Sequence, residues 1–149
     1  MLGRLSRAFA LFINWFDGIC ASVCGAWMMA SAFFTLPLSW NDWMPASILD
    51  PLPIPDFMKQ DLFWAGFALL LVNGVPNVIA LVFRFRGKLA VSYRWGITAG
   101  ILLIFWTMFE LVFIPNGLSA FYLLLGVLQL VSSSHAAGNL NRRKDYCDK

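Results

Sequence analysis

Four long apolar stretches constrain this 149-residue chain more than any other feature of its sequence. They cover about residues 17–36, 62–83, 95–114 and 118–138. Each holds about 20 residues, the length of α-helix that crosses a bilayer core of about 30 Å. The second stretch has no charged residue between Leu62 and Phe83, whereas a core helix of a water-soluble domain would carry a polar face. The pattern predicts an all-α membrane protein with four transmembrane helices in an antiparallel bundle.

The rest of the sequence leaves no room for a separate soluble domain. Apolar residues make up 60% of the chain and charged residues 13%, a balance that soluble domains do not have. We expect one four-helix transmembrane domain over residues 1–149. The longest segment outside the predicted spans is an outer loop, residues 37–61, where proline recurs at every second position over residues 51–55. Such a run cannot continue a helix, so we expect an apolar cap over the helix ends, with a binding lid as the alternative.

The basic residues predict which way the helices run. All of the eleven Lys and Arg except Lys59 lie before the first span, between the second and third, or at the fourth span's end and beyond. Because basic residues near span ends are retained in the cytoplasm, we expect both termini and the loop between the second and third spans to be cytoplasmic. The basic segments at residues 84–94 and 142–144 suit the anionic headgroups of the lipid bilayer; nucleic acid is not an expected partner.

The amino-terminal segment resembles a signal peptide, because Arg4 and Arg7 precede an apolar run. The run is long for such a peptide, and Asp17 interrupts it. We therefore expect an uncleaved first helix, with residues 1–16 lying partly along the inner membrane interface.

Small residues recur four positions apart, a spacing that places them on one face of a helix. They are Gly18, Ser22, Ala21 and Gly25 in the first span and Gly96 and Gly100 in the third. Small side chains let helix backbones approach closely, which is how helices associate in lipid. The pattern predicts close helix packing, within one chain as the favoured interpretation or between chains as the alternative.

Two carboxylates fall within the predicted spans. Glu110 lies near the outer end of the third span, where it can be a proton or cation site reached from outside, or a carboxylate that reaches the headgroup layer. Asp17 lies at the inner end of the first span, where we expect it to reach water or to pair with Arg84 or Arg94. On this registration the two carboxylates are too far apart to form an acid/base pair within one monomer.

Three amide side chains lie near the middle of the predicted bilayer, namely Asn73, Asn77 and Gln129. Pro76 has no amide hydrogen, so the second helix should bend near Asn73 and Gly74. The amides can line a water-filled path or a ligand pocket beside the bend. Hydrogen bonding between helices is the commoner role of such residues.

No pattern of chemically active residues indicates a metal site, a cofactor or an enzyme. The only histidine is His135, and no cluster of His, Cys or carboxylates has the spacing of a zinc or iron–sulfur site. A phosphate-binding glycine loop, a nucleophile elbow and a zincin motif are all absent from the sequence. We therefore expect no metal, no cofactor and no catalytic residue.

The order of several features over residues 34–132, about two thirds of the chain, resembles a known group of proteins. The features are Asp50-Pro51 in the outer loop, Asn73-Gly74 in the second span, Gly100, Trp106 and Glu110 in the third, and Leu125-Gly126 in the fourth. This order resembles small, mostly uncharacterised four-helix proteins of the bacterial inner membrane, of broadly DoxX-like architecture. The resemblance implies the same topology, a location in the inner (plasma) membrane and a bacterial origin, and it implies no reaction.

Two hypotheses for function follow. The first is a protein without enzymatic activity that acts by association, as a homo-oligomer or as an accessory subunit of another membrane protein. The alternative is a small transporter or channel in which Glu110 takes up protons and Asn73, Asn77 and Gln129 line the path. The two hypotheses differ in whether these four residues face a shared cavity.

Overall fold

The computed structural model of the protein describes residues 2–34, 40 and 44–147, and the side chains of the part between residues 4 and 142. The described residues form helices, turns and bends, with no β-strand among them. Four helical segments are long and apolar enough to cross a membrane, namely Arg4–Ser31, Phe63–Phe85, Leu89–Phe113 and Gly117–Arg142. The predicted all-helical fold with four helices of membrane-spanning length is confirmed.

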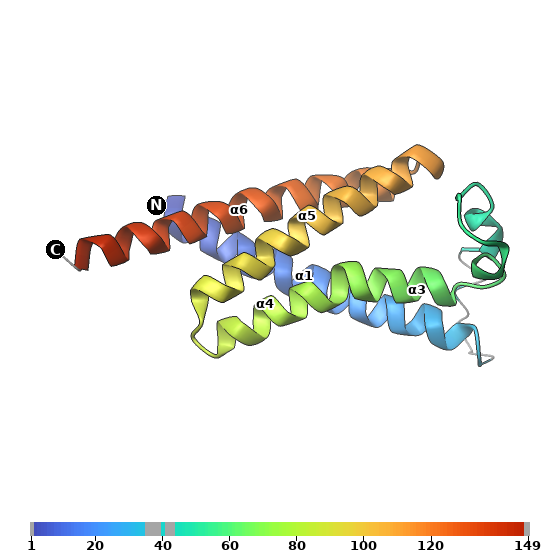
Figure 1. Ribbon diagram of the computed structural model, residues 1–149, viewed down its shortest axis with the longest axis horizontal. Helices are drawn as coiled ribbons and strands as arrows, with labels where there is room; N and C mark the ends of the chain where they lie inside the picture. Colours follow the sequence, from blue (N-terminus) through green and yellow to red (C-terminus); the bar gives the residue numbers. More distant parts are fainter. Residues whose placement is uncertain (1, 35–39, 41–43, 148–149) are drawn as a thin grey trace.

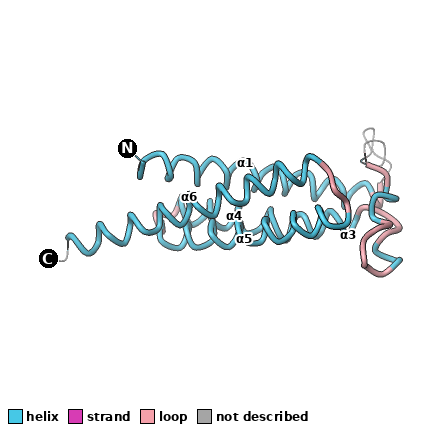
Figure 2. Tube along the Cα trace, turned by 90° about the horizontal axis from the view of Figure 1, so that it is seen from above, coloured by secondary structure: helices cyan, strands magenta, loops and turns pink. Residues whose placement is uncertain are grey.

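The helices run roughly along one long axis, as Figure 1 and Figure 2 show. The long elements are α1 (Leu2–Ser31), α3 (Phe63–Leu69), the π-helical turn η3 (Leu70–Gly74), α4 (Val75–Phe85), α5 (Leu89–Phe113) and α6 (Gly117–Cys147). Both chain ends and the α4–α5 turn lie at one end of the bundle, which we call the terminal end (Figure 1). The α5–α6 turn and two short 3-10 helices, η1 (Ala46–Leu49) and η2 (Asp56–Met58), lie at the other, which we call the loop end.

The first helix is longer than the sequence suggested. It begins at Leu2, so residues 2–16 continue the same helix and do not form a separate interfacial segment. The side chains of Leu5, Phe9 and Phe12 are exposed on its outer face, so this part of the helix is apolar enough to lie in lipid. Asp17 consequently lies midway between Arg4 and Ser31, about 20 Å of helix rise from each.

The second helix is irregular where the sequence predicts a bend. The π-helical turn Leu70–Gly74 separates α3 from α4, and Pro76 follows it directly in the first turn of α4. Proline removes one amide from the helical ladder, and single π-turns in long helices are commonly found at functional sites. The irregular turn brings the Asn73 carbonyl and the Asn77 side chain together.

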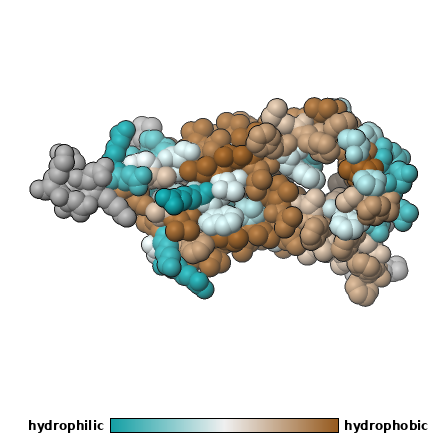
Figure 3. Space-filling model, in the orientation of Figure 1, coloured by the Kyte–Doolittle hydropathy of each residue, from teal (hydrophilic) through white to brown (hydrophobic). Residues whose placement is uncertain are grey.

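The four long segments form two pairs. α5 and α6 pack against each other along their length, and α1 packs against α3, η3 and α4. α4 also packs on α5, and α1 packs on α6, so the two pairs meet closely in the half of the bundle nearer the terminal end. α3 packs mainly on α1, and Figure 3 shows the surface hollowed between the two pairs near the loop end.

Part of the predicted outer loop forms the apolar cap that the sequence suggested. Pro45 and Pro55 directly precede η1 and η2, where the fixed φ of proline suits the start of a helical turn. Leu49 is buried against Met28 of α1 and Leu62, so η1 covers the ends of these helices. Residues 35–39 and 41–43 of the predicted loop lie outside the described part of the chain.

The small residues named by their spacing lie at contacts inside the chain. A Cβ atom added to Gly25 would lie 2.7 Å from the carbonyl oxygen of Gly66 in α3, and one added to Gly18 would lie 3.0 Å from Asn77 Cβ. Ser22 packs on Gly74, since a Cβ atom added to Gly74 would lie 2.9 Å from Ser22 Oγ. Gly96 and Gly100 of α5 face α6, at Ser133 and Leu130 respectively. These faces are used to hold the four helices together.

We expect Gly100→Leu to destabilise the protein by about 2 kcal/mol, the usual cost of overpacking. A Cβ atom there would lie only 2.9 Å from the Leu130 backbone nitrogen, so α5 and α6 would have to separate. Thermal unfolding in detergent, at two protein concentrations, measures the effect. Gly138→Leu is the matched control, because a Cβ atom at Gly138 has no heavy atom within 4 Å. A loss of stability that depends on protein concentration would instead indicate a contact between chains.

Candidate functional site

The middle of the bundle contains a group of fully buried polar side chains, which we call the central polar cluster. Its members are Asn14 and Asp17 of α1, Asn73 of η3, Asn77 of α4 and Gln129 of α6. None of them is more than 2% exposed. Buried polar groups are costly unless they are hydrogen-bonded, so their mutual contacts decide what the cluster can do.

Asn77 is the central member of the cluster. Its Nδ2 donates to Asp17 Oδ2 at 2.8 Å and to the backbone oxygen of Asn73 at 2.8 Å. Its Oδ1 accepts a hydrogen bond from Gln129 Nε2 at 2.5 Å. One side chain thus connects α1, η3 and α6.

Gln129 adds a second connection between α6 and α1. Its Nε2 also donates to Asn14 Oδ1 at 2.7 Å. Asn14 and Asp17 are three positions apart and therefore lie on the same face of α1. The hydrogen bonds run in sequence from Asp17 through Asn77 and Gln129 to Asn14.

Three polar atoms of the cluster have no hydrogen-bond partner in the described part of the chain. They are Asn14 Nδ2, Asn73 Oδ1 and Gln129 Oε1. An unpaired buried polar group costs about 1–3 kcal/mol. Ordered water or a bound polar guest removes that cost, and native interiors routinely use water in this way. The cluster can therefore bind water or a small polar guest as well as hold the helices together.

Asp17 does not lie where sequence reasoning placed it. We expected it at the inner interface, in water or paired with Arg84 or Arg94, but it is 1% exposed and bonded to Asn77. Arg84 instead donates from Nη2 to the backbone oxygen of Arg7 at 3.2 Å. The cause is the early start of α1, which moves Asp17 to the middle of its helix.

Glu110 is separate from the central polar cluster. Its Oε1 accepts a hydrogen bond from Trp106 Nε1 at 2.6 Å, and its Oε2 accepts one from Ser119 Oγ at 2.7 Å. Ser119 lies in the first turn of α6, where Asn116 Oδ1 accepts a hydrogen bond from its backbone amide at 2.8 Å. About 15 Å of helix rise separates Ser119 from Gln129 along α6. The structure therefore brings Asn73, Asn77 and Gln129 together and places Glu110 near the α5–α6 turn.

The chemistry available to the cluster is that of one carboxylate surrounded by amides. No group of three or more His, Cys, Asp or Glu side chains comes together among the described residues. A carboxylate can bind a proton or a cation, and neighbouring amides can both donate and accept hydrogen bonds. The fold and the site together define a four-helix protein of membrane-spanning dimensions with a buried polar centre that contains one carboxyl group.

No family model, curated protein or solved structure matches the chain. The resemblance to DoxX-like four-helix membrane proteins therefore stays a prediction from the sequence.

Proposed function

We propose that this protein is a small multi-pass membrane protein that moves a proton or another small cation across the bilayer, with Asp17 as the central binding group. The observation that carries the proposal is the complete burial of Asp17 at the middle of α1, in contact with Asn77. A carboxylate within the hydrocarbon is costly, and such residues commonly mark ion or proton paths. Amide atoms of the cluster that have no hydrogen-bond partner in the described part of the chain support a site that binds a ligand.

The association hypothesis has less support from the packing. The small residues pack against helices of the same chain, as favoured from the sequence, and not at a contact face between chains. The outer surface of the bundle carries large apolar side chains, among them Phe105, Val112 and Val131, and these suit lipid as well as a protein partner. A homo-oligomer or a complex with another membrane protein is compatible with transport.

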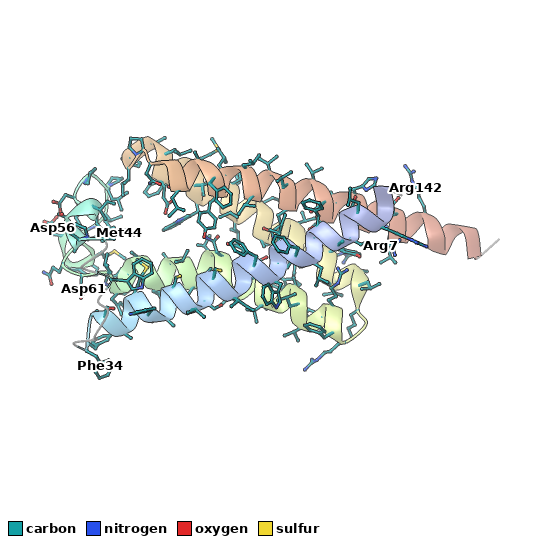
Figure 4. All side chains as sticks on the ribbon, turned by 180° about the vertical axis from the view of Figure 1, so that it is seen from behind. Arg7, Phe34, Met44, Asp56, Asp61 and Arg142 are labelled. Atoms are coloured by element: carbon teal, nitrogen blue, oxygen red, sulfur yellow. The ribbon has the colours of Figure 1, made fainter. Side chains whose placement is uncertain are left out.

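For the orientation we infer that the terminal end faces the cytoplasm of a bacterial cell and the loop end faces outward. In Figure 4, Arg7 and Arg142 lie toward the terminal end, whereas Asp56 and Asp61 lie at the loop end. Basic residues are retained on the cytoplasmic side, which supports this assignment. The basic terminal end would then meet anionic lipid headgroups.

Access to Asp17 is expected from the loop end. The two helix pairs meet less closely there, and the surface between them is hollowed (Figure 3). On α6, Tyr122 lies between Ser119, which donates to Glu110, and Gln129 of the central polar cluster. A guest would pass these side chains before it reached the central polar cluster.

The proposal is tested by flux measurements on purified protein in liposomes. A trapped pH indicator reports the decay of a pH gradient, with the membrane potential clamped by potassium and an ionophore. Gradients of sodium or potassium are measured in parallel with suitable indicators, and protein-free liposomes are the control. We expect at least one cation to move faster with protein present. Equal leak rates with and without protein, for every cation, would contradict the proposal.

Glu110→Gln separates this proposal from the sequence-based hypothesis that Glu110 takes up the proton. We expect the variant to keep most of its flux and to lose about 1 kcal/mol of stability, because the charge-assisted bonds from Trp106 and Ser119 become neutral. Flux and thermal unfolding are measured on the same preparation. Abolished flux at normal stability would return Glu110 to the transport path.

A further inference from the structure

Buried polar side chains continue from the central polar cluster toward the terminal end. Ser92 and Tyr93 of α5 and Ser133 of α6 are at most 1% exposed. The Oγ atoms of both serines and the Tyr93 hydroxyl have no hydrogen-bond partner in the described part of the chain, and the same holds for Asn14 Nδ2. Helix packing alone does not require buried polar groups without hydrogen-bond partners, yet three helices contribute them here.

Two of these atoms, Ser133 Oγ and Asn14 Nδ2, lie beside Gly96, where the absence of a side chain lets them approach α5. A Cβ atom added to Gly96 would lie 2.7 Å from Ser133 Oγ and 3.5 Å from Asn14 Nδ2. Ser133 lies one helical turn beyond Gln129 on α6, and Ser92 lies one turn before Gly96 on α5. Gly96 and Ser133 therefore lie between the central polar cluster on one side and Ser92 on the other.

Tyr93 lies one layer nearer the terminal end. It packs with Ala10, which precedes Asn14 by one turn of α1, and with Ala136, which follows Ser133 in α6. The guanidinium carbon of Arg84 lies 5.4 Å from the centre of the Tyr93 ring. The Nη1 atom of Arg84 is buried and also has no hydrogen-bond partner among the described residues. Polar atoms thus lie in each layer from Asp17 to the basic terminal end.

We propose that Asn14, Ser133, Ser92 and Tyr93 hold a chain of ordered water molecules that conducts protons between Asp17 and the terminal end, an inference that rests on the proposed function. Water bridges unpaired buried groups where the site is polar and has room. Each transfer breaks one O–H bond and forms the next, so a proton leaves the Asp17 carboxylic acid and one positive charge reaches the terminal end. The carboxylate that remains takes up its next proton from the loop end.

The polar groups of this path favour a proton over a metal cation. Hydroxyl groups donate and accept hydrogen bonds, so they can orient water for proton transfer. A metal cation would need carboxylate or carbonyl oxygens to replace its hydration shell along the way. The side chains of Ser92, Tyr93 and Ser133 carry no charge, and they offer one oxygen each.

The double variant Gly96→Ala/Ser133→Ala tests the water chain directly. The added methyl group lies close to the position that the Ser133 hydroxyl leaves, so packing volume is nearly conserved while the polar connection is removed. We expect proton flux in liposomes to fall about tenfold or more, which corresponds to about 1.4 kcal/mol on the barrier. The matched control is Gly138→Ala/Ser134→Ala, because Gly138 has open space around it and Ser134 is exposed. The control should conduct like the unmodified protein.

Measurement of Asp17→Asn beside these variants separates the two proposals. If the folded double variant conducts protons normally while Asp17→Asn does not, the water chain is overturned and the proposed function stands. If Asp17→Asn also conducts every cation normally, the proposed function is overturned. A sodium or potassium flux that falls as much as the proton flux in the double variant overturns the assignment to protons.

Two single variants test the water chain if the double variant does not fold. Ser133→Ala and Tyr93→Phe each remove one hydroxyl and add no atom, so both should fold. A severalfold slower proton flux in either variant, with the thermal unfolding midpoint unchanged, supports the water chain. Normal proton flux in both variants overturns it.

Discussion

Asp17→Asn is expected to abolish cation flux through the reconstituted protein while its fold and thermal stability stay close to those of the unmodified chain. The variant side chain has the same size, and its amide oxygen can still accept the hydrogen bond from Asn77 Nδ2. It cannot take up a proton or carry a negative charge, so it cannot bind a cationic guest. The helix connections through Asn77 and Gln129 remain, and only the chemistry of the site is removed.

The measurement is the decay of ion gradients in liposomes at matched protein content, with circular dichroism and thermal unfolding to establish the fold. Asp50→Asn is the control, since it makes the same chemical change at an exposed carboxylate of the loop end. We expect Asp50→Asn to conduct normally. Undiminished flux in Asp17→Asn would show that the buried carboxylate has a structural role only.

The number, order and approximate bounds of the membrane-length helices could be predicted from the sequence because they depend on local hydropathy alone. The first helix was the exception. Its predicted span begins at about Asp17 and leaves out the apolar residues that precede Asp17. The structure continues the helix back to Leu2, and Arg4 and Arg7 mark the end of the apolar segment instead.

That single shift explains most of what sequence reasoning missed in the candidate site. Asn73, Asn77 and Gln129 were identified because each lies deep within an apolar run. Asn14 lay outside the predicted span, although its spacing from Asp17 places both on one helix face. The partners of Asn77 were not predictable, because they depend on how α1 and α6 cross α4.

The two hydrogen-bond partners of Glu110 differ in how readily the sequence predicts them. Its bond to Trp106, one helical turn earlier, was available from spacing alone. Its bond to Ser119 depends on the tight α5–α6 turn, for which Pro115, Asn116 and Gly117 gave the signal. The transport hypothesis grouped Glu110 with the amides although it lies nearer the outer end of its span, and the structure gives it separate partners.

Asn77→Ala is expected to destabilise the protein by about 3 kcal/mol, because it removes the partner of a buried carboxylate as well as a bond to Gln129. Adding Asp17→Ala to this variant should restore part of the lost stability, since no buried carboxylate then lacks its partner. Unfolding by denaturant or heat in detergent measures all four members of this double-mutant cycle. Asn141→Ala is the control, because Asn141 is exposed on α6.

The stability of the double variant relative to Asn77→Ala distinguishes two descriptions of the central polar cluster. If the cluster only packs helices, each substitution removes neutral bonds worth about 0.6 kcal/mol apiece. The bond that Asp17 and Asn77 share is lost in either single variant, and the double variant is then no more stable than Asn77→Ala. If Asp17 carries charge in the folded protein, the double variant is more stable than Asn77→Ala alone, even though it lacks more side-chain atoms. A double variant that is more stable than Asn77→Ala, together with absent flux in Asp17→Asn, would mean that the chain retains a costly buried charge for transport and not for stability. A double variant no more stable than Asn77→Ala would leave the buried carboxylate without the energetic signature of an ion-binding site.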